Sequence, residues 1–192
     1  SSITVLKNNS VLPLERFGKK QILEVVVSDA ENYRTEIHRS STSSPNEAVG
    51  DYFTAQLKRR YTNLQTIKIN PSSDSLDFKS VFKKANDADL IICPVFSKAR
   101  SGSGTFGLPP GIIGVVDSLT KLGKPMALIS LGSPYVIGAF PNAGSVVCTY
   151  SDCEVSTEAA VEALFGEIPA RGKLPVTIPG LFSYGSGIDL SQ

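Results

Sequence analysis

Hydrophobic residues gather in short runs that alternate with segments of helical spacing. Five runs are apolar and rich in β-branched residues, a pattern typical of buried strands. These runs are residues 21–29, 64–70, 88–96, 125–132 and 144–150. The run at 64–70, LQTIKIN, alternates apolar and polar residues. It therefore predicts a strand near the edge of a sheet, with one face less buried than the other.

Four segments between or after these runs carry apolar residues at helical spacing. They are residues 44–61, 77–88, 111–123 and 156–166. The inward faces predicted for the first two helices are Val49, Phe53, Leu57 and Tyr61, then Phe78, Val81, Phe82 and Ala85. Ser44 and Glu47 match a capping box, which predicts the start of the first helix. Ser156 is the N-cap expected for the last helix, and Gly166 lies just past its end.

The alternation of strands and helices predicts the fold class. Apolar strands separated by amphipathic helices indicate an α/β three-layer sandwich, in which helices cover both faces of a mainly parallel sheet. We expect five or six strands, a flavodoxin-like arrangement and one domain over residues 1–192. Ligand sites in such sheets lie outside the carboxyl ends of the strands. The loops that follow the carboxyl ends of the predicted strands are 29–43, 70–76, 97–110, 132–143 and 150–155.

The segment after the last helix is unusual. Residues 166–180, GEIPARGKLPVTIPG, hold three prolines and cannot form a continuous helix. Leu174, Val176 and Ile178 alternate with other residues as in a strand. We expect residues 174–178 to be extended and to pair with the sheet, as an added antiparallel strand.

Composition narrows the classes of partner. The chain has 192 residues, a formal net charge of +1 and 41% hydrophobic residues, as in an ordinary globular domain. This charge does not draw the chain to nucleic acid, and no apolar run reaches the roughly 20 residues of a membrane span. Cys93 and Cys148 lie in apolar runs and are expected to be buried thiols. The chain opens at Ser1, and we interpret it as a fragment or a mature product.

Motifs that would indicate a self-contained active site are missing or misplaced. The GxGxxG at 102–107 is separated from the preceding strand and from the following helix, which argues against a dinucleotide site. The chain has one histidine, His38, and neither a GxSxG elbow nor a P-loop. Acidic pairs follow two of the predicted strands, Asp29 with Glu31 and Asp152 with Glu154. Those strands should be separated by others, so we expect no carboxylate dyad. With one histidine and no ligand cluster we expect no metal site, and we expect no cofactor.

Four segments together resemble the second, C-terminal domain of glycoside hydrolase family 3, in its β-N-acetylglucosaminidase-like branch. GEIPARGKLPVTIPG resembles the closing segment of that domain, and SITVLKNNSVLPL at 2–14 resembles its opening segment. LISLGSPYVIGAFP at 128–141 is similar to its fourth-strand region, where Ser133 stands in place of the usual Asn. VVCTYSDCEVSTEAAVEALFGE at 146–167 is similar to the fifth strand and last helix. The four segments occur in the family's order and span nearly the whole chain.

The resemblance implies a longer parent protein, with an N-terminal TIM-like barrel before this domain. That parent would hydrolyse terminal β-linked sugars, N-acetylglucosamine preferred, by a retaining mechanism without a cofactor, in carbohydrate metabolism or cell-wall turnover. The family's aspartate nucleophile lies on the barrel, and in the acetylglucosaminidase branch an Asp-His pair on a barrel loop is the acid/base. The glucosidase branch uses a glutamate of the second domain, but no glutamate here matches that motif. No catalytic residue is therefore carried over to this chain.

The resemblance also suggests which residues face the barrel or the carbohydrate at the domain interface. The candidates are Asp29, Arg34, Arg100, Phe106 and Ser133. Of the loops, 97–110 is long and glycine-rich, and we expect it to meet the barrel and to be mobile without it. A bacterial periplasmic or extracellular location is preferred over the cytoplasm. The alternative is a stand-alone flavodoxin-like module that binds a small molecule or a carbohydrate, which the coding sequence upstream of Ser1 would distinguish.

Overall fold

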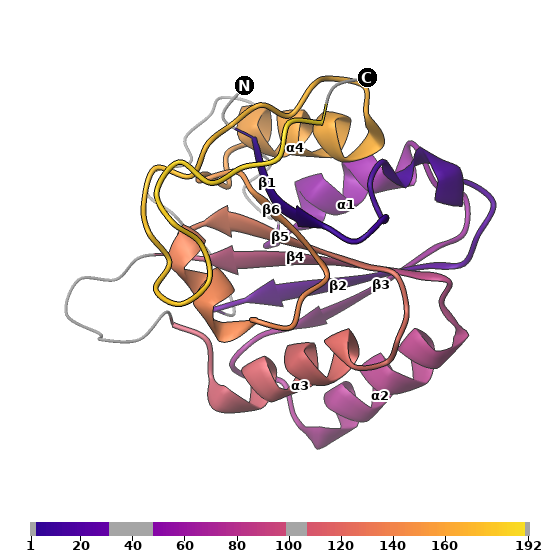
Figure 1. Cartoon of the computed structure of the whole chain (residues 1–192). Coiled ribbons are helices and arrows are strands. Elements are labelled where there is room, and N and C mark those ends of the chain that lie inside the picture. Colours follow the sequence, from indigo (N-terminus) through magenta and orange to yellow (C-terminus); the bar gives the residue numbers. More distant parts are fainter. Residues whose placement is uncertain (1–2, 31–47, 99–106, 191–192) are drawn as a thin grey trace.

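The computed structural model of the chain describes residues 3–30, 48–98 and 107–190, which form an α/β three-layer sandwich (Figure 1). Its sheet has six strands in the order β1-β6-β5-β4-β2-β3. The strands are β1 (Thr4–Asn8), β2 (Ile22–Ser28), β3 (Leu64–Ile69), β4 (Leu90–Ser97), β5 (Met126–Gly132) and β6 (Ser145–Cys148). The strands from β2 to β6 run parallel, and β1 is antiparallel to β6. Without β1 the order is 3-2-4-5-6, the flavodoxin-like order that the sequence predicts.

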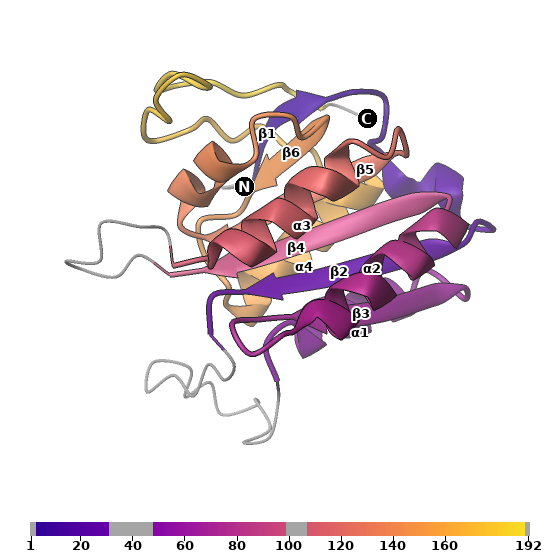
Figure 2. The same ribbon diagram turned by 90° about the horizontal axis from the view of Figure 1, so that it is seen from below.

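Helices cover both faces of this sheet (Figure 2). The α-helices are α1 (Asp51–Lys58), α2 (Ser75–Asp87), α3 (Pro110–Thr120) and α4 (Glu154–Phe165), and two short 3-10 helices are η1 (Leu14–Phe17) and η2 (Pro134–Ala139). Helices α2 and α3 lie on one face, with η2, and α1 and α4 lie on the other, with η1. The fold class predicted from the sequence is thus confirmed, and β3 lies at the edge, as the alternation in its sequence predicts.

Successive side chains of each strand enter different cores, because they point to opposite faces of the sheet. In β2, Leu23, Val25 and Val27 join the core beneath α2 and α3. Ile22 and Val26 join the core beneath α1 and α4. Every residue of β2 and β4 is buried, as expected for central parallel strands. The thiols of Cys93 and Cys148 are free and buried, as predicted.

The predicted first helix is shorter than its sequence pattern. Gly50 precedes α1 with a φ of 83°, a left-handed conformation that a continuous helix from 44 to 61 cannot contain. Gly50 also lies so close to the sheet that a Cβ atom there would be 2.6 Å from Val26 Cγ1. The proposed capping box of Ser44 and Glu47 falls outside the described residues. Phe53, Leu57 and the following Tyr61 are buried, so the predicted inward face is correct.

The last helix begins earlier than predicted. Cys153, rather than Ser156, occupies its N-cap position, and the Ser156 hydroxyl accepts a hydrogen bond from the Cys153 thiol at 3.2 Å. The prediction of Ser156 as N-cap was therefore wrong, because a cysteine gives no capping signal in the sequence. The predicted end is confirmed: Gly166 follows the helix with a φ of 77°.

The prediction that residues 174–178 add a strand to the sheet was also wrong. The Leu174 N–H donates to Ser186 O at 2.8 Å, and Ile178 forms an isolated bridge with Phe182, so the segment pairs within the tail. Pro175 and Pro179 lack the N–H groups that a sheet ladder requires. Leu174 and Ile178 are nevertheless buried in the core beneath α2 and α3, which explains their apolar alternation.

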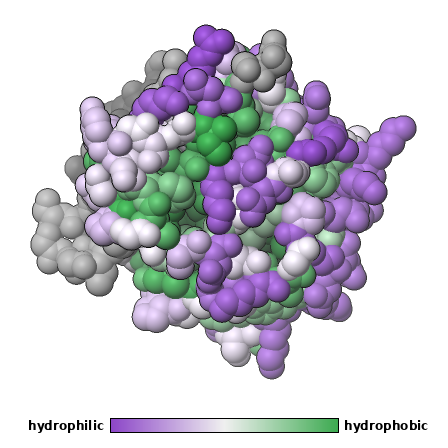
Figure 3. All heavy atoms as spheres, in the orientation of Figure 1, coloured by the Kyte–Doolittle hydropathy of each residue, from purple (hydrophilic) through white to green (hydrophobic). Residues whose placement is uncertain are grey.

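The added antiparallel strand is β1, and the tail protects its outer edge. Ile188 N–H donates to Val5 O at 2.7 Å, and Gly172 N–H donates to Ile3 O at 2.9 Å. An uncovered edge strand is a site for unwanted pairing with other chains, and the tail occupies those backbone groups. Figure 3 shows the molecule in the orientation of Figure 1, where hydrophobic residues are visible among hydrophilic ones.

The contact between Gly172 and β1 generates a prediction about stability. A Cβ atom at residue 172 would lie 2.5 Å from both Ile3 O and Thr4 Oγ1, so Gly172→Ala must displace the tail from the edge of β1. We expect the free energy of unfolding to fall by about 1–3 kcal/mol, as in other overpacked sites. The measurement is equilibrium denaturation in urea. Gly114→Ala in α3 is the matched control, since a Cβ there meets nothing within 4 Å. Equal stability of the two variants would contradict this account of the tail.

Candidate functional site

The carboxyl ends of the parallel strands bring four polar residues to one edge of the sheet. Asp29 follows β2, Lys98 follows β4, Ser133 follows β5, and Asp152 lies between β6 and α4. Because β2, β4, β5 and β6 are consecutive neighbours in the sheet, these residues form a row, which we call the carboxyl-edge cluster. Strand order reverses between β2 and β4, and ligands of open α/β sheets bind at such a switch point.

Lys98 joins the two carboxylates of the cluster. Its backbone N–H donates to Asp29 Oδ2 at 2.9 Å, and its ammonium Nζ lies 3.7 Å from Asp152 Oδ2. The strands that precede the two aspartates are three spacings apart, about 14 Å. A retaining glycosidase requires carboxyls about 5–5.5 Å apart. The cluster is therefore organised around a lysine and does not have the arrangement of a dyad.

Asp29 supports the backbone at the switch point. Its side chain is only 4% exposed, and its own N–H donates to Phe96 O at 3.1 Å. Gly107, with a φ of 79°, packs on it so closely that a Cβ would be 2.8 Å from Asp29 Oδ2. A side chain at residue 107 would thus meet the carboxylate. Asp29 therefore links the end of β2 to both ends of the 99–106 segment, through Lys98 and Gly107.

Ser133 is likewise fixed through its backbone. Its N–H donates to Ser97 O at 2.8 Å, and its carbonyl accepts from the Ser130 hydroxyl at 3.0 Å. Gly132 has a φ of 111°, and a Cβ there would approach Ser97 O to 2.5 Å. These contacts attach the start of η2 to the end of β4. The next residues of η2 include Tyr135, whose surface is 37% exposed at this edge.

The other predicted site residues are not described by the structure. Arg34, Arg100 and Phe106 lie in the segments 31–47 and 99–106, as do Glu31 and His38. Of the five candidates, the structure therefore places Asp29 and Ser133 at the same edge of the sheet. Sequence reasoning did not select Lys98 as the residue that connects the aspartates, because a lysine in a loop is usually solvated.

The part of the chain that the structure describes contains neither a group of metal ligands nor a membrane-spanning helix. Among residues 3–30, 48–98 and 107–190, no group of three or more His, Cys, Asp or Glu side chains could hold a metal ion. Within the same ranges, no helix is long and apolar enough to cross a membrane.

Comparison with solved structures supports this fold. A fungal multi-domain GH3 β-N-acetylglucosaminidase, which carries a GCN5-related glucosamine N-acetyltransferase region, is 26% identical with a TM-score of 0.71; the match covers 95% of this chain and 18% of that one. The GH3 β-N-acetylglucosaminidase of Paenibacillus sp. str. FPU-7 is 14% identical with a TM-score of 0.66, over 95% of this chain and 31% of that one. The β-glucosidase EmGH1 of Erythrobacter marinus is 18% identical with a TM-score of 0.69, over 98% and 33%.

The chain thus spans between about a fifth and a third of these structures. A search of curated proteins gave no match. The sequence model of the Glycosyl hydrolase family 3 C-terminal domain matches residues 3–185, nearly all of the chain. The four segments that resemble this family and the six-stranded sandwich agree with that match. This chain belongs to glycoside hydrolase family 3, as its C-terminal domain.

Proposed function

We propose that this domain is the non-catalytic second domain of a longer hydrolase that removes terminal β-linked sugars, N-acetylglucosamine preferred. The preference is supported by the fungal β-N-acetylglucosaminidase, which is 26% identical over 95% of this chain. The parent's N-terminal TIM-like barrel supplies the nucleophile and the acid/base. This domain packs on the barrel through the carboxyl edge of its sheet.

The domain assignment rests on the family match. The observation that carries the proposed role of the carboxyl edge is the position of Lys98 between two carboxylates at the switch point. A lysine that contacts Asp29 through its backbone and Asp152 through its ammonium group is held in place by other parts of the same chain. Such a residue can donate hydrogen bonds to sugar hydroxyls or to a facing domain without taking part in proton transfer. The exposed aromatic ring of Tyr135 adds the kind of side chain that is enriched at protein interfaces.

The remaining candidates are included in the same proposal. Asp29 and Ser133 belong to the carboxyl-edge cluster, and Arg34, Arg100 and Phe106 lie in the two segments attached to this edge. We propose that these loops meet the barrel and shield its sugar pocket. Ser133, which stands where the family usually has asparagine, belongs to this proposed surface.

We predict that the 192-residue chain has no glycosidase activity on its own. It lacks a barrel nucleophile, so we expect no turnover of aryl β-N-acetylglucosaminide or aryl β-glucoside above a buffer blank. Adding the barrel domain of the same parent should produce activity on the acetylglucosaminide. Turnover by the chain alone that survives repurification and is lost in Asp29→Asn or Asp152→Asn would overturn the proposal. Specific binding of sugars by the chain without any barrel would favour the stand-alone module.

Another prediction concerns Lys98 in the full-length parent. Lys98→Met removes the ion pair with Asp152 and retains the backbone hydrogen bond to Asp29. We expect KM to rise about 2- to 5-fold, the equivalent of one partly exposed ion pair, with kcat nearly unchanged. Steady-state kinetics measure both constants.

The matched control is Lys121→Met. Lys121 also forms an ion pair, with Asp117, but it follows α3 at the opposite edge of the sheet, just before β5 begins. Its removal should leave KM and kcat as in the wild type. If the two variants have the same kinetics, or if Lys98→Met lowers kcat alone, the carboxyl edge does not bind substrate or position the barrel.

A further inference from the structure

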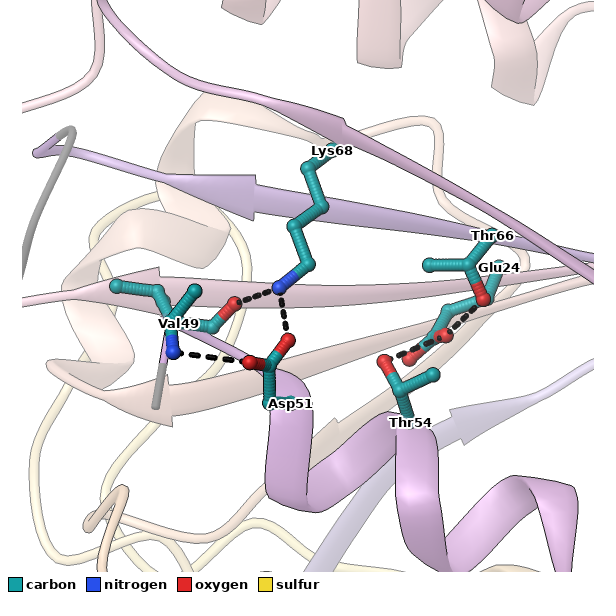
Figure 4. Close-up of polar contacts among 7 residues, drawn as sticks. Glu24, Val49, Asp51, Thr54, Thr66 and Lys68 are labelled. Carbon is teal, nitrogen blue, oxygen red and sulfur yellow. Dashed lines mark hydrogen bonds and ion pairs between the residues drawn. The ribbon is translucent and has the colours of Figure 1, made fainter. Parts of the chain in front are cut away.

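A glutamate lies inside a buried strand whose neighbouring residues are apolar. Glu24 is the third residue of β2, ILEVVVS, and its surface is 0% exposed. Its side chain points to the face of the sheet covered by α1, between that helix and the neighbouring strand β3 (Figure 4). A fully buried carboxyl group is costly unless it is paired or protonated. The site described above does not use this residue.

The hydrogen bonds of Glu24 come from two hydroxyl groups on different elements. Thr54 of α1 donates to Glu24 Oε2 at 2.8 Å. Thr66, its partner in the register of β3, donates to the same oxygen at 2.9 Å. Glu24 Oε1 has no partner, and no other buried side-chain oxygen or nitrogen in the described part of the chain lacks one. The carboxyl group therefore connects α1 to the sheet through one oxygen only.

The charged groups around Glu24 do not neutralise it. On β3, Lys68 pairs with Asp51 and donates to Val49 O at 2.9 Å, both at the start of α1 (Figure 4). Lys58, at the other end of α1, is exposed. The two lysines lower the pKa of Glu24 less than burial raises it.

The neighbours of Glu24 on β4 and on β2 itself carry no positive charge. From β4 the titratable neighbour is the buried Cys93 thiol, whose pKa is raised to about 12 by burial and then by the charge of Glu24. On β2 itself, Ile22 and Val26 flank Glu24 on the same face and are apolar. With burial as its largest cause, the pKa of Glu24 is raised from 4.5 to about 7.

We propose that Glu24 is a proton-controlled attachment point between helix α1 and the sheet. With its proton, the carboxyl group stays between α1 and β3, accepting from Thr54 and Thr66. When it ionises, the negative charge with its unpartnered Oε1 favours conformations in which α1 moves away and water reaches the carboxylate. The closed form, in which α1 packs on the sheet, binds the proton of Glu24 more tightly than the open form does. The stability that the proton gives the closed form is therefore complete below about pH 4.5 and is lost as pH rises through about 7.

The position of α1 connects this attachment to the carboxyl edge. Gly50, just before α1, packs against Val26 and Phe96, where a Cβ would lie 2.6 Å and 3.3 Å away. The carbonyl of Phe96 accepts the N–H of Asp29. Movement of α1 therefore removes packing from the residues that fix Asp29 at the switch point. The order of the carboxyl edge is thus pH-dependent, through a group that does not belong to it.

The test is amide hydrogen exchange of the full chain between pH 5.5 and pH 8, corrected for the intrinsic pH dependence of exchange. For a carboxyl with a pKa of about 7 when closed and 4.5 when open, opening of α1 should increase roughly 25-fold over this range. Glu24→Gln, which has the same shape and no charge, should abolish the increase. The amides of α2, on the opposite face, should show no such change in either protein. Glu15→Gln, an exposed glutamate of η1, is the control that should behave as the wild type.

The proposal is overturned if α1 protection is independent of pH in the wild type, or if Glu24→Gln keeps the same dependence. Because Glu24→Gln could fail to fold, a second measurement uses the native carboxyl group. Carboxyl-carbon NMR of the wild type should show Glu24 titrating near pH 7. Thr54→Val, which removes one donor to the carboxylate, should move that midpoint to higher pH, whereas Thr54→Ser should restore it. A Glu24 midpoint near 4.5, or one unmoved by Thr54→Val, would refute the proposal.

Discussion

The structure depends on the burial of its central strands on both faces. β2 and β4 are buried along their whole length, so each needs a layer of side chains above and below. That requirement places α2 and α3 on one face and α1 and α4 on the other. Since all four neighbouring pairs from β2 to β6 are parallel, their carboxyl ends lie at one edge. The row formed by Asp29, Lys98, Ser133 and Asp152 is a direct result of this topology.

The same burial makes the exceptions informative. A carboxyl group inside β2 is the kind of conflict between local sequence and fold that natural proteins retain where it has a use. Glu24 accepts hydrogen bonds from Thr66 on the neighbouring strand β3 and from Thr54 on helix α1, so its partners come from both the sheet and a helix. At the carboxyl edge, by contrast, polar groups are attached to backbone amides and carbonyls. In our proposal Glu24 responds to protons, whereas Asp29 and Ser133 at the carboxyl edge are fixed by their contacts with backbone groups.

Much of the fold could be predicted from the sequence, because strands such as ILEVVVS and LIICPVFS are short, nearly continuous apolar runs that alternate with segments of helical spacing. The arrangement of the carboxyl-edge cluster could not be predicted, because the contact of Lys98 with Asp152 depends on strand order, which no local pattern encodes. The role of the tail was misjudged because Leu174 and Ile178 alternate like strand residues while Pro175 and Pro179 prevent pairing in a sheet. The start of α1 was misjudged because Gly50 interrupts an apolar spacing that continues on both sides of it. Glu24 had a signal, a single charge in a buried strand, but its two hydroxyl partners lie 30 and 42 residues away.

The pairing of the tail with β1 has a mechanical consequence. Val5 and Ile188 face each other in one bridge, and Ala170 and Leu190 form another within the tail, so the C-terminal tail is paired with the first strand of the chain (Figure 1). A pulling force applied through both ends would break the hydrogen bonds of these bridges one after another, instead of shearing the whole sheet at once. The tail would peel from β1 first, while the parallel strands and their helices stayed folded. The edge that protects the sheet is thus also the point at which tension would begin to open the domain.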